Sequence, residues 1–159
     1  MKIRVSLSRQ RLELLDEAGE CQRAYAVSTA KAGPGEQRGS YRTPRGQHIV
    51  RAKIGAGQPE NAVFVRRRPT GEIYSPALAC AHPDRDWILT RILWLSGCEP
   101  GRNRLGEVDT MRRFIYIHGT PDDVELGQPG SIGCVRMNNR DIIELFDLVA
   151  PGTAVEIVE

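Results

Sequence analysis

The sequence has no long apolar run, no paired-cysteine motif and little net charge. No segment reaches the ~20 consecutive apolar residues that a transmembrane helix requires, so we expect no membrane-spanning helix. The formal net charge is +2 at pH 7, which gives no reason to expect nucleic acid as a partner. Internal repeats and low-complexity tracts are also absent, so nothing divides the chain into smaller units.

The four cysteines, Cys21, Cys80, Cys98 and Cys134, are few for a chain of this size and contain no CxxC spacing. This pattern argues against a disulfide framework. The cysteines and histidines that come nearest to a metal-ligand set, Cys80 with His82 and Cys134 with His118, fit no common zinc spacing. We therefore expect neither a metal site nor an organic cofactor.

The first residues alternate between polar and apolar from Met1 onward and contain no apolar run of signal-peptide type. We therefore expect a cytoplasmic protein, with a periplasmic location as the alternative if a leader precedes these residues. The length of 159 residues predicts one domain over residues 1–159 that is large enough for a hydrophobic core. Nothing in the sequence indicates the oligomeric state.

Short strands dominate the hydrophobic pattern. Ile3, Val5 and Leu7 alternate with polar residues, and Leu12 and Leu14 continue the period after a turn, which predicts a β-hairpin. Residues 66–71 are expected to form an exposed hairpin tip with solvated arginines, and residues 31–46 and 99–105 to form loops. Further strands are expected at residues 23–28, 48–54, 62–65, 88–95, 113–118 and 155–157.

One helix is clear near the C-terminus. Asn138 is a suitable N-cap with Asp141 three residues later, and the helix ends before Pro151. Its apolar face consists of Ile142, Leu145, Phe146 and Val149. The pattern predicts a mainly β fold, a β-rich α+β domain of two packed sheets with one covering helix.

Residues 116–137 carry the strongest functional signal. The predicted strand at 113–118 ends at His118, and Cys134 follows 16 positions later. A thiol becomes a useful nucleophile when an imidazole shares or removes its proton, and a loop of this length can bring the two together. Strand alternation places Phe114 and Tyr116 on the same face as His118.

Glycines and an arginine flank this pair. The carbonyl of Gly119 can accept the Nδ1 proton of His118 and leave Nε2 free for the thiol. Gly133 permits a tight turn, and the amides of Gly133 and Cys134 can point at a developing oxyanion. Arg136 offers a forked cation that suits a substrate carboxylate.

Each residue also has a structural interpretation. Cys134 alone is more often a small core residue, and His118 alone is more often a hydrogen-bonded structural histidine. Together, between glycines and beside an arginine, they favour catalysis. Asn103 and Arg104, in the loop at 99–105, are candidate substrate contacts, although plain loop polarity explains them equally well.

The segments I-H-G-T and S-I-G-C-V-R resemble the signature of the L,D-transpeptidase catalytic domain, the YkuD family. The resemblance continues upstream in Y-A-V-S-T at residues 25–29 and T-P-R-G at residues 43–46. It continues downstream through the helix and strand at residues 141–158. One position departs from the family pattern, because Ile132 stands where the family usually has histidine.

The resemblance implies a peptidoglycan stem peptide as substrate and no cofactor. Cys134 would attack the carbonyl that joins an L-centre to a terminal D-amino acid, with His118 as the base, and D-alanine would leave a thioester behind. Arg136 and Ser131 are then candidates for holding the substrate, and Tyr116 for lining its pocket.

The second step divides the hypotheses. The missing export signal favours hydrolysis, which makes the chain an L,D-carboxypeptidase that trims stem tetrapeptides during muropeptide recycling. The alternative is an L,D-transpeptidase that transfers the acyl group to an amine and forms crosslinks or exchanges D-amino acids. A non-catalytic module that binds peptidoglycan peptides is a third hypothesis, and the intact pair of Cys134 and His118 argues against it.

Overall fold

The computed structural model describes residues 1–159 and contains ten strands, two α-helices and one 3-10 helix. The strands are β1 Lys2–Ser6, β2 Arg11–Leu15, β3 Cys21–Ser28, β4 Gly46–Ile54, β5 Ala62–Val65, β6 Arg68–Ile73, β7 Ile88–Gly97, β8 Tyr116–Gly119, β9 Val135–Met137 and β10 Ala154–Val158. The helices are α1 Pro76–Ala81, α2 Asn139–Leu148 and the 3-10 helix Gly106–Val108. The mainly β fold is thus confirmed.

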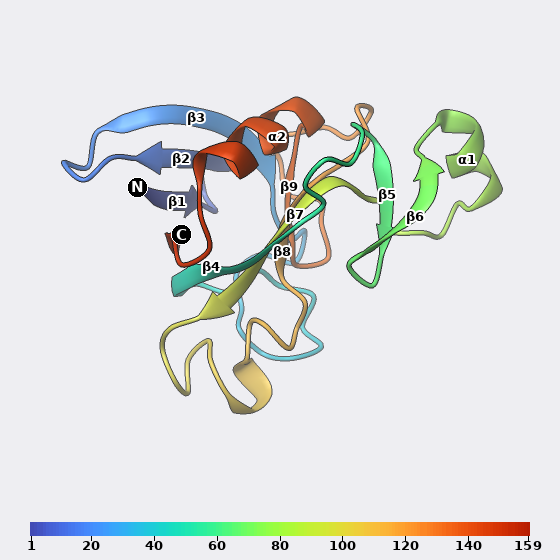
Figure 1. The fold of residues 1–159 in the computed structure, drawn as a ribbon. Coiled ribbons are helices and arrows are strands. Elements are labelled where there is room, and N and C mark those ends of the chain that lie inside the picture. The colour runs from blue at the N-terminus through green and yellow to red at the C-terminus, as the bar shows by residue number, and fades with distance from the viewer.

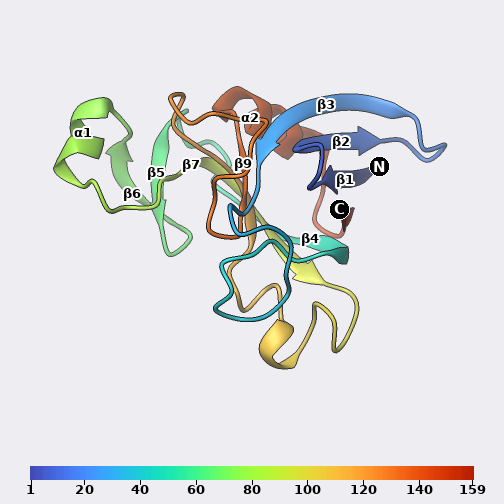
Figure 2. The same cartoon turned by 180° about the vertical axis from the view of Figure 1, so that it is seen from behind.

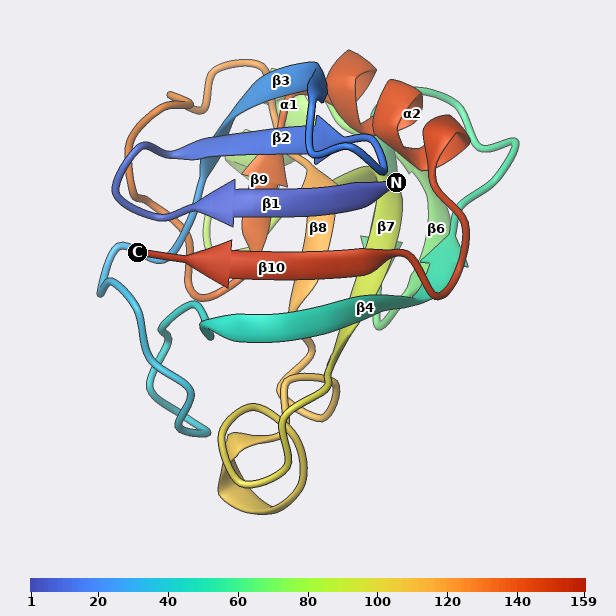
Figure 3. The same cartoon turned by 90° about the vertical axis from the view of Figure 1, so that its left-hand side faces the viewer.

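All ten strands belong to one sheet, in the order β4-β10-β1-β2-β3-β9-β8-β7-β5-β6, and β4 also pairs with β7. This extra pairing closes the sheet on itself, with only β5 and β6 outside the ring. In Figure 3 the strands β3, β2, β1, β10 and β4 lie in front, and β9, β8 and β7 lie behind them. The expectation of two packed sheets is therefore corrected, because two facing layers are present but hydrogen bonds join them into one sheet.

The main core lies between these layers and continues under α2. Alternate residues of β1 and β2, among them Ile3, Val5, Leu12 and Leu14, are completely buried, which confirms the predicted hairpin. Each such side chain contributes about 1.5–3 kcal/mol by leaving water. The core then extends to the buried face of α2, which packs against β7 and β8.

The C-terminal helix begins and ends as its sequence predicts. The side chain of Asn138 accepts hydrogen bonds from the amides of Arg140 and Asp141, which would otherwise lack partners in the first turn. Ile142, Leu145 and Phe146 are its buried apolar residues. No helix in the structure is both long and apolar enough to cross a lipid bilayer.

Strands β5 and β6 extend the sheet beyond the ring, and with α1 they project from one side of the molecule (Figures 1 and 2). Only Arg66 and Arg67 form the hairpin turn, both with positive φ, because β6 already begins at Arg68. The predicted tip at residues 66–71 was therefore too long. Helix α1 was not predicted, although Ser75 caps it and a proline opens it.

The strand that carries the histidine is shorter than predicted. It begins at Tyr116, whereas residues 111–114 form a turn in which Phe114 has φ +59° and is half exposed. Tyr116 and His118 point away from the main core and Ile117 points into it, as alternation requires. Phe114 is thus a turn residue beside the site and not the first residue on that face of the strand.

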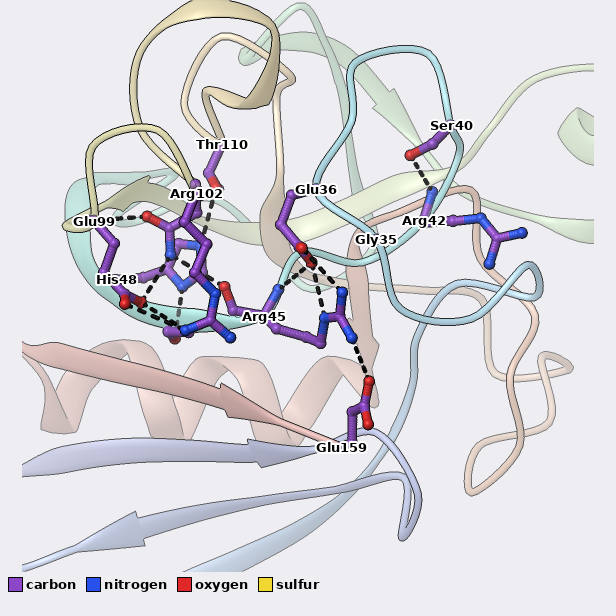
Figure 4. Close-up of polar contacts among 12 residues, drawn as sticks. Gly35, Glu36, Ser40, Arg42, Arg45, His48, Glu99, Arg102, Thr110 and Glu159 are labelled. Carbon is purple, nitrogen blue, oxygen red and sulfur yellow. Dashed lines mark hydrogen bonds and ion pairs between the residues drawn. The ribbon is translucent and has the colours of Figure 1, made fainter.

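Two long loops meet beside the end of β10. Figure 4 shows Arg45 between the carboxylates of Glu36 and Glu159, with ion pairs to both. Near them His48 is buried, with its ring nitrogens 3.1 Å from the carbonyl of Gly46 and 2.9 Å from the hydroxyl of Thr110. These contacts tie the loop at residues 31–45 and the loop that precedes β8 to the sheet.

Candidate active site

The parallel pairing of β8 with β9 places the candidate residues on one face of the sheet. Ile117 pairs with Val135 and His118 with Arg136. Cys134 therefore lies beside Tyr116, which precedes His118 by two residues along β8. Ile117 and Val135 face the main core. Tyr116, His118, Cys134 and Arg136 therefore share the opposite face, where Tyr116 and Cys134 pack in a second, smaller apolar cluster.

His118 is held in one orientation. Its Nδ1 lies 2.6 Å from the carbonyl oxygen of Gly119, and because a carbonyl can only accept, Nδ1 carries the proton. The ring is completely buried, and Nε2 has no hydrogen-bond partner. Burial also lowers the pKa of His118 below its usual 6.5. The imidazole is thus neutral and presents a free lone pair at Nε2.

Gly119 is the residue that packing at this position requires. A Cβ there would lie 2.4 Å from Oδ1 of Asn139 and 2.6 Å from the carbonyl oxygen of Leu89. Asn139 is itself fixed, because its Oδ1 accepts a hydrogen bond of 2.6 Å from the hydroxyl of Thr90. The carbonyl that orients His118 therefore belongs to a tightly packed backbone.

Cys134 is not hydrogen-bonded to His118 in this structure. Its Sγ accepts from the amide of Tyr116 at 3.3 Å and donates to the carbonyl of Phe114 at 3.4 Å. Burial raises the pKa of the Cys134 thiol to about 12. The resting pair is therefore a neutral thiol and a neutral imidazole, so this arrangement suits proton transfer from the thiol to the histidine better than a preformed thiolate.

The loop before Cys134 is shaped by Ser131. Its hydroxyl donates to the carbonyl of Cys134 at 2.6 Å and accepts from the amide of Gly133 at 3.2 Å. Ser131 is buried, so the structure gives it a supporting role in place of the expected substrate contact. The amide of Gly133 is occupied as well, which leaves the amide of Cys134 as the available oxyanion donor in this loop.

Thr43 fixes the same loop from the other side. Its buried hydroxyl accepts from the amide of Ala30 at 3.0 Å and donates to the carbonyl of Gly133 at 2.9 Å. Gly133 has φ +135°, a conformation that favours glycine. The T-P-R-G element thus determines the backbone conformation immediately before the thiol.

Arg136 is already paired. Its guanidinium donates to the carbonyl of Gly130 and to Oδ1 of Asp86, both at 3.1 Å. The forked cation that we expected to hold a substrate carboxylate is therefore fixed, as expected, but is already paired with Asp86 in this structure. Asn103 is corrected as well, because it is completely buried and its side chain bonds to the backbone of Arg45, Gln47 and Glu99.

A pocket of about 510 Å³ opens beside Cys134. Tyr116 lines it as expected, and Ile132 contributes an apolar side chain that is 55% exposed. Its other lining includes the arginines at positions 38, 66, 67, 112 and 113. The sequence analysis did not find Arg67 or Arg113, because a run of arginines and a lone arginine before a strand look like ordinary surface residues.

A half-buried thiol beside an oriented, neutral imidazole, at the edge of a pocket, is the arrangement of a cysteine-dependent acyltransferase or hydrolase. The model of the L,D-transpeptidase catalytic domain family, YkuD, matches residues 1–157, and the chain belongs to this family.

Known relatives agree with this assignment. The B. subtilis protein YkuD, an L,D-transpeptidase by name, is 49% identical over 46 residues, which are 29% of this chain and 28% of that protein. An L,D-transpeptidase structure from Mycobacterium smegmatis has a TM-score of 0.57 at 16% identity and covers 99% of this chain and 58% of that chain. L,D-transpeptidase 3 from Mycobacterium tuberculosis, solved with a faropenem-derived adduct, has a TM-score of 0.58 at 17% identity, over 99% of this chain and 59% of that one. The chain thus spans well under two thirds of the length of each.

Proposed function

We propose that this chain cleaves the bond before the terminal D-amino acid of peptidoglycan stem tetrapeptides through a thioester on Cys134. Sγ attacks the carbonyl of the L-centre while Nε2 of His118 takes the thiol proton. The same proton then passes to the departing amine, and the D-amino acid leaves. The amide of Cys134 stabilises the oxyanion.

The observation that carries this proposal is the free Nε2 of His118. A completely buried ring nitrogen without a hydrogen-bond partner is costly, and a structural histidine would have both nitrogens bonded, as His48 has. Here one nitrogen is fixed by Gly119, and the other is free on the face that carries the thiol. A base that acts on Cys134 needs this arrangement, and a module that only binds peptides does not.

We further propose that water is the main acceptor of the acyl group, which makes the activity an L,D-carboxypeptidase. Transfer to an amine requires a bound and oriented acceptor. An amine that enters the pocket meets the apolar side chain of Ile132 and five guanidinium groups, which repel an ammonium ion. Hydrolysis requires only a water molecule that His118 can deprotonate. Cytoplasmic trimming of recycled peptides agrees with this activity and belongs to the same proposal.

Crosslinking or exchange of D-amino acids is the second candidate, favoured by membership of the L,D-transpeptidase family. The experiment that separates the two is mass spectrometry of products from a muropeptide tetrapeptide at high concentration, with and without an added D-amino acid. We expect tripeptide and free D-alanine as the main products and at most a minor exchange product. A majority of crosslinked dimers would make the transpeptidase assignment correct.

A further inference from the structure

The pocket beside Cys134 has an unusual charge. Five arginines line it, and the only acidic residue among its lining is Asp86, which already pairs with Arg136. None of the five forms an ion pair with a carboxylate, whereas eight other arginines of the chain do. We call these five the arginine collar: Arg38, Arg66, Arg67, Arg112 and Arg113.

Two members of the collar are fixed by neutral partners. The guanidinium of Arg67 donates to the hydroxyl of Tyr116 at 2.9 Å and lies over the rings of Trp94 and Phe114, at 4.7 and 4.8 Å from their centroids. Arg113 donates to the carbonyls of Gly35 and Arg42. Such contacts orient a guanidinium and leave its charge uncompensated.

The backbone around the collar is strained. Tyr41, Arg66, Arg67 and Phe114 all line the pocket, and each has a positive φ, between +50° and +64°. Residues other than glycine rarely adopt this conformation, and it persists where the surrounding structure imposes it, often at ligand sites. Arg66 and Arg67 form a two-residue hairpin turn, which requires positive φ at both positions and usually contains glycine or asparagine, so two arginines there are unusual.

We propose that the arginine collar binds an acyl donor through its free carboxylates, so that the substrate is a peptide with unamidated carboxyl groups near the reactive carbonyl. This inference rests on the proposed function for the identity of the donor. A guanidinium fork matches the two oxygens of a carboxylate, and an uncompensated cationic cleft raises the local concentration of anions. An amidated peptide of the same shape lacks these contacts.

The collar can be tested without any turnover. Iodoacetate and iodoacetamide alkylate the same thiolate, but only iodoacetate is an anion, so the ratio of their rates reports the local potential and cancels the thiol pKa. Peptide mapping gives this ratio for Cys134 and for the exposed Cys21 and Cys98 of the same protein. We expect the ratio at Cys134 to exceed that at the exposed thiols by about tenfold or more at low salt, and to fall as salt is added.

Variants assign the effect to the collar. Arg66→Gln, Arg67→Gln and Arg112→Gln should each lower the ratio at Cys134 by about threefold or more, and Arg67→Lys should retain most of it. Arg68→Gln is the matched control, because it removes the same charge from the same hairpin but from a residue outside the pocket lining. A ratio at Cys134 equal to that at Cys21, or an equal loss in Arg68→Gln, would overturn the proposal.

A binding measurement then addresses the ligand. The tripeptide product cannot acylate Cys134, so its protection of the thiol from iodoacetamide reports binding alone. We expect the tripeptide with free carboxylates to protect at about tenfold lower concentration than its amidated counterpart. Equal protection by both peptides, or protection by inorganic phosphate alone, contradicts carboxylate recognition. If these results hold while no tetrapeptide is cleaved, the collar stands and the proposed function fails.

Discussion

The thiol of Cys134 lies 3.3 Å from the amide nitrogen of Tyr116 and makes no hydrogen bond to His118. Cys134 and His118 are therefore both neutral, with a proton on the sulfur and a free lone pair on Nε2 of the imidazole. In the proposed mechanism Sγ and Nε2 must come into hydrogen-bond contact, which an approaching substrate carbonyl can induce. Hydrogen bonds at catalytic sites often tighten only when substrate is bound.

Replacing His118 with glutamine should lower turnover by at least about 100-fold, because general-base catalysis contributes about that factor or more. The free energy of unfolding should change little in comparison. His48→Gln is the matched control, since it alters the other buried histidine, whose two ring nitrogens are both bonded. It should reduce stability and have a smaller effect on the turnover of the folded protein. Equal effects of the two variants on turnover would show that His118 is not the general base.

Thr43→Val keeps the shape of the side chain but removes the hydroxyl that joins Ala30 to Gly133. The variant should lose about 1–3 kcal/mol of unfolding free energy, and kcat should fall more than KM rises. Urea denaturation and steady-state kinetics measure both. Thr70→Val, whose exposed hydroxyl bonds only to Glu72 two residues along β6, should be neutral, and Thr43→Ser should retain activity. Unchanged kcat in Thr43→Val would show that the loop before Cys134 holds without this contact.

Asn103→Ala should affect stability and not substrate binding. The side chain donates to two backbone carbonyls and accepts from the amide of Glu99, so its removal leaves buried groups unpaired at about 1–3 kcal/mol. KM of the variant at a temperature where it remains folded should equal that of the wild type. Arg104→Ala, at the exposed neighbouring position, should leave stability unchanged. A raised KM in Asn103→Ala alone would restore its role as a substrate contact.

Cys134 should make stability depend on alkaline pH. Burial raises the pKa of the folded thiol from 9.0 to about 12, so above pH 9 the unfolded chain releases a proton that the folded chain retains. The contribution of the Cys134 thiol to the free energy of unfolding is therefore fully present below pH 9. It is lost as pH rises toward 12, by at most about 1.4 kcal/mol per pH unit. The difference between wild type and Cys134→Ala in denaturation curves from pH 8 to 11 isolates this effect. A constant difference over that range would show that the pKa of the thiol is not raised in the folded protein.

The sequence predicts most elements of this fold because their signals are local. Alternation marks Ile3 and Val5 as core residues, and Asn138 marks the start of α2. The pairing of β4 with β7 leaves no local pattern, so the sequence predicts two sheets where the structure has one closed sheet. Phe114 looked like a strand residue because its apolar side chain continues the run, whereas its positive φ depends on tertiary contacts.

The site shows the same limits. His118, Gly119 and Cys134 could be placed together because motif spacing constrains them, and the hydrogen bond from Nδ1 to the carbonyl of Gly119 follows from adjacency in the chain. The pairing of Arg136 with Asp86 joins residues that are distant in sequence, so it could not be foreseen. The role of Arg67 likewise depends on rings that the fold brings to it.

Acylation of Cys134 is the central claim, and one measurement tests it most directly. Imipenem is a β-lactam whose strained ring an activated thiol opens without loss of atoms. Intact-mass analysis after incubation at neutral pH should show one adduct of the full mass of imipenem. Peptide mapping should place it on Cys134, and folded Cys134→Ala should remain unmodified. A wild-type protein that stays unmodified, or an equal adduct on Cys134→Ala, would contradict the account.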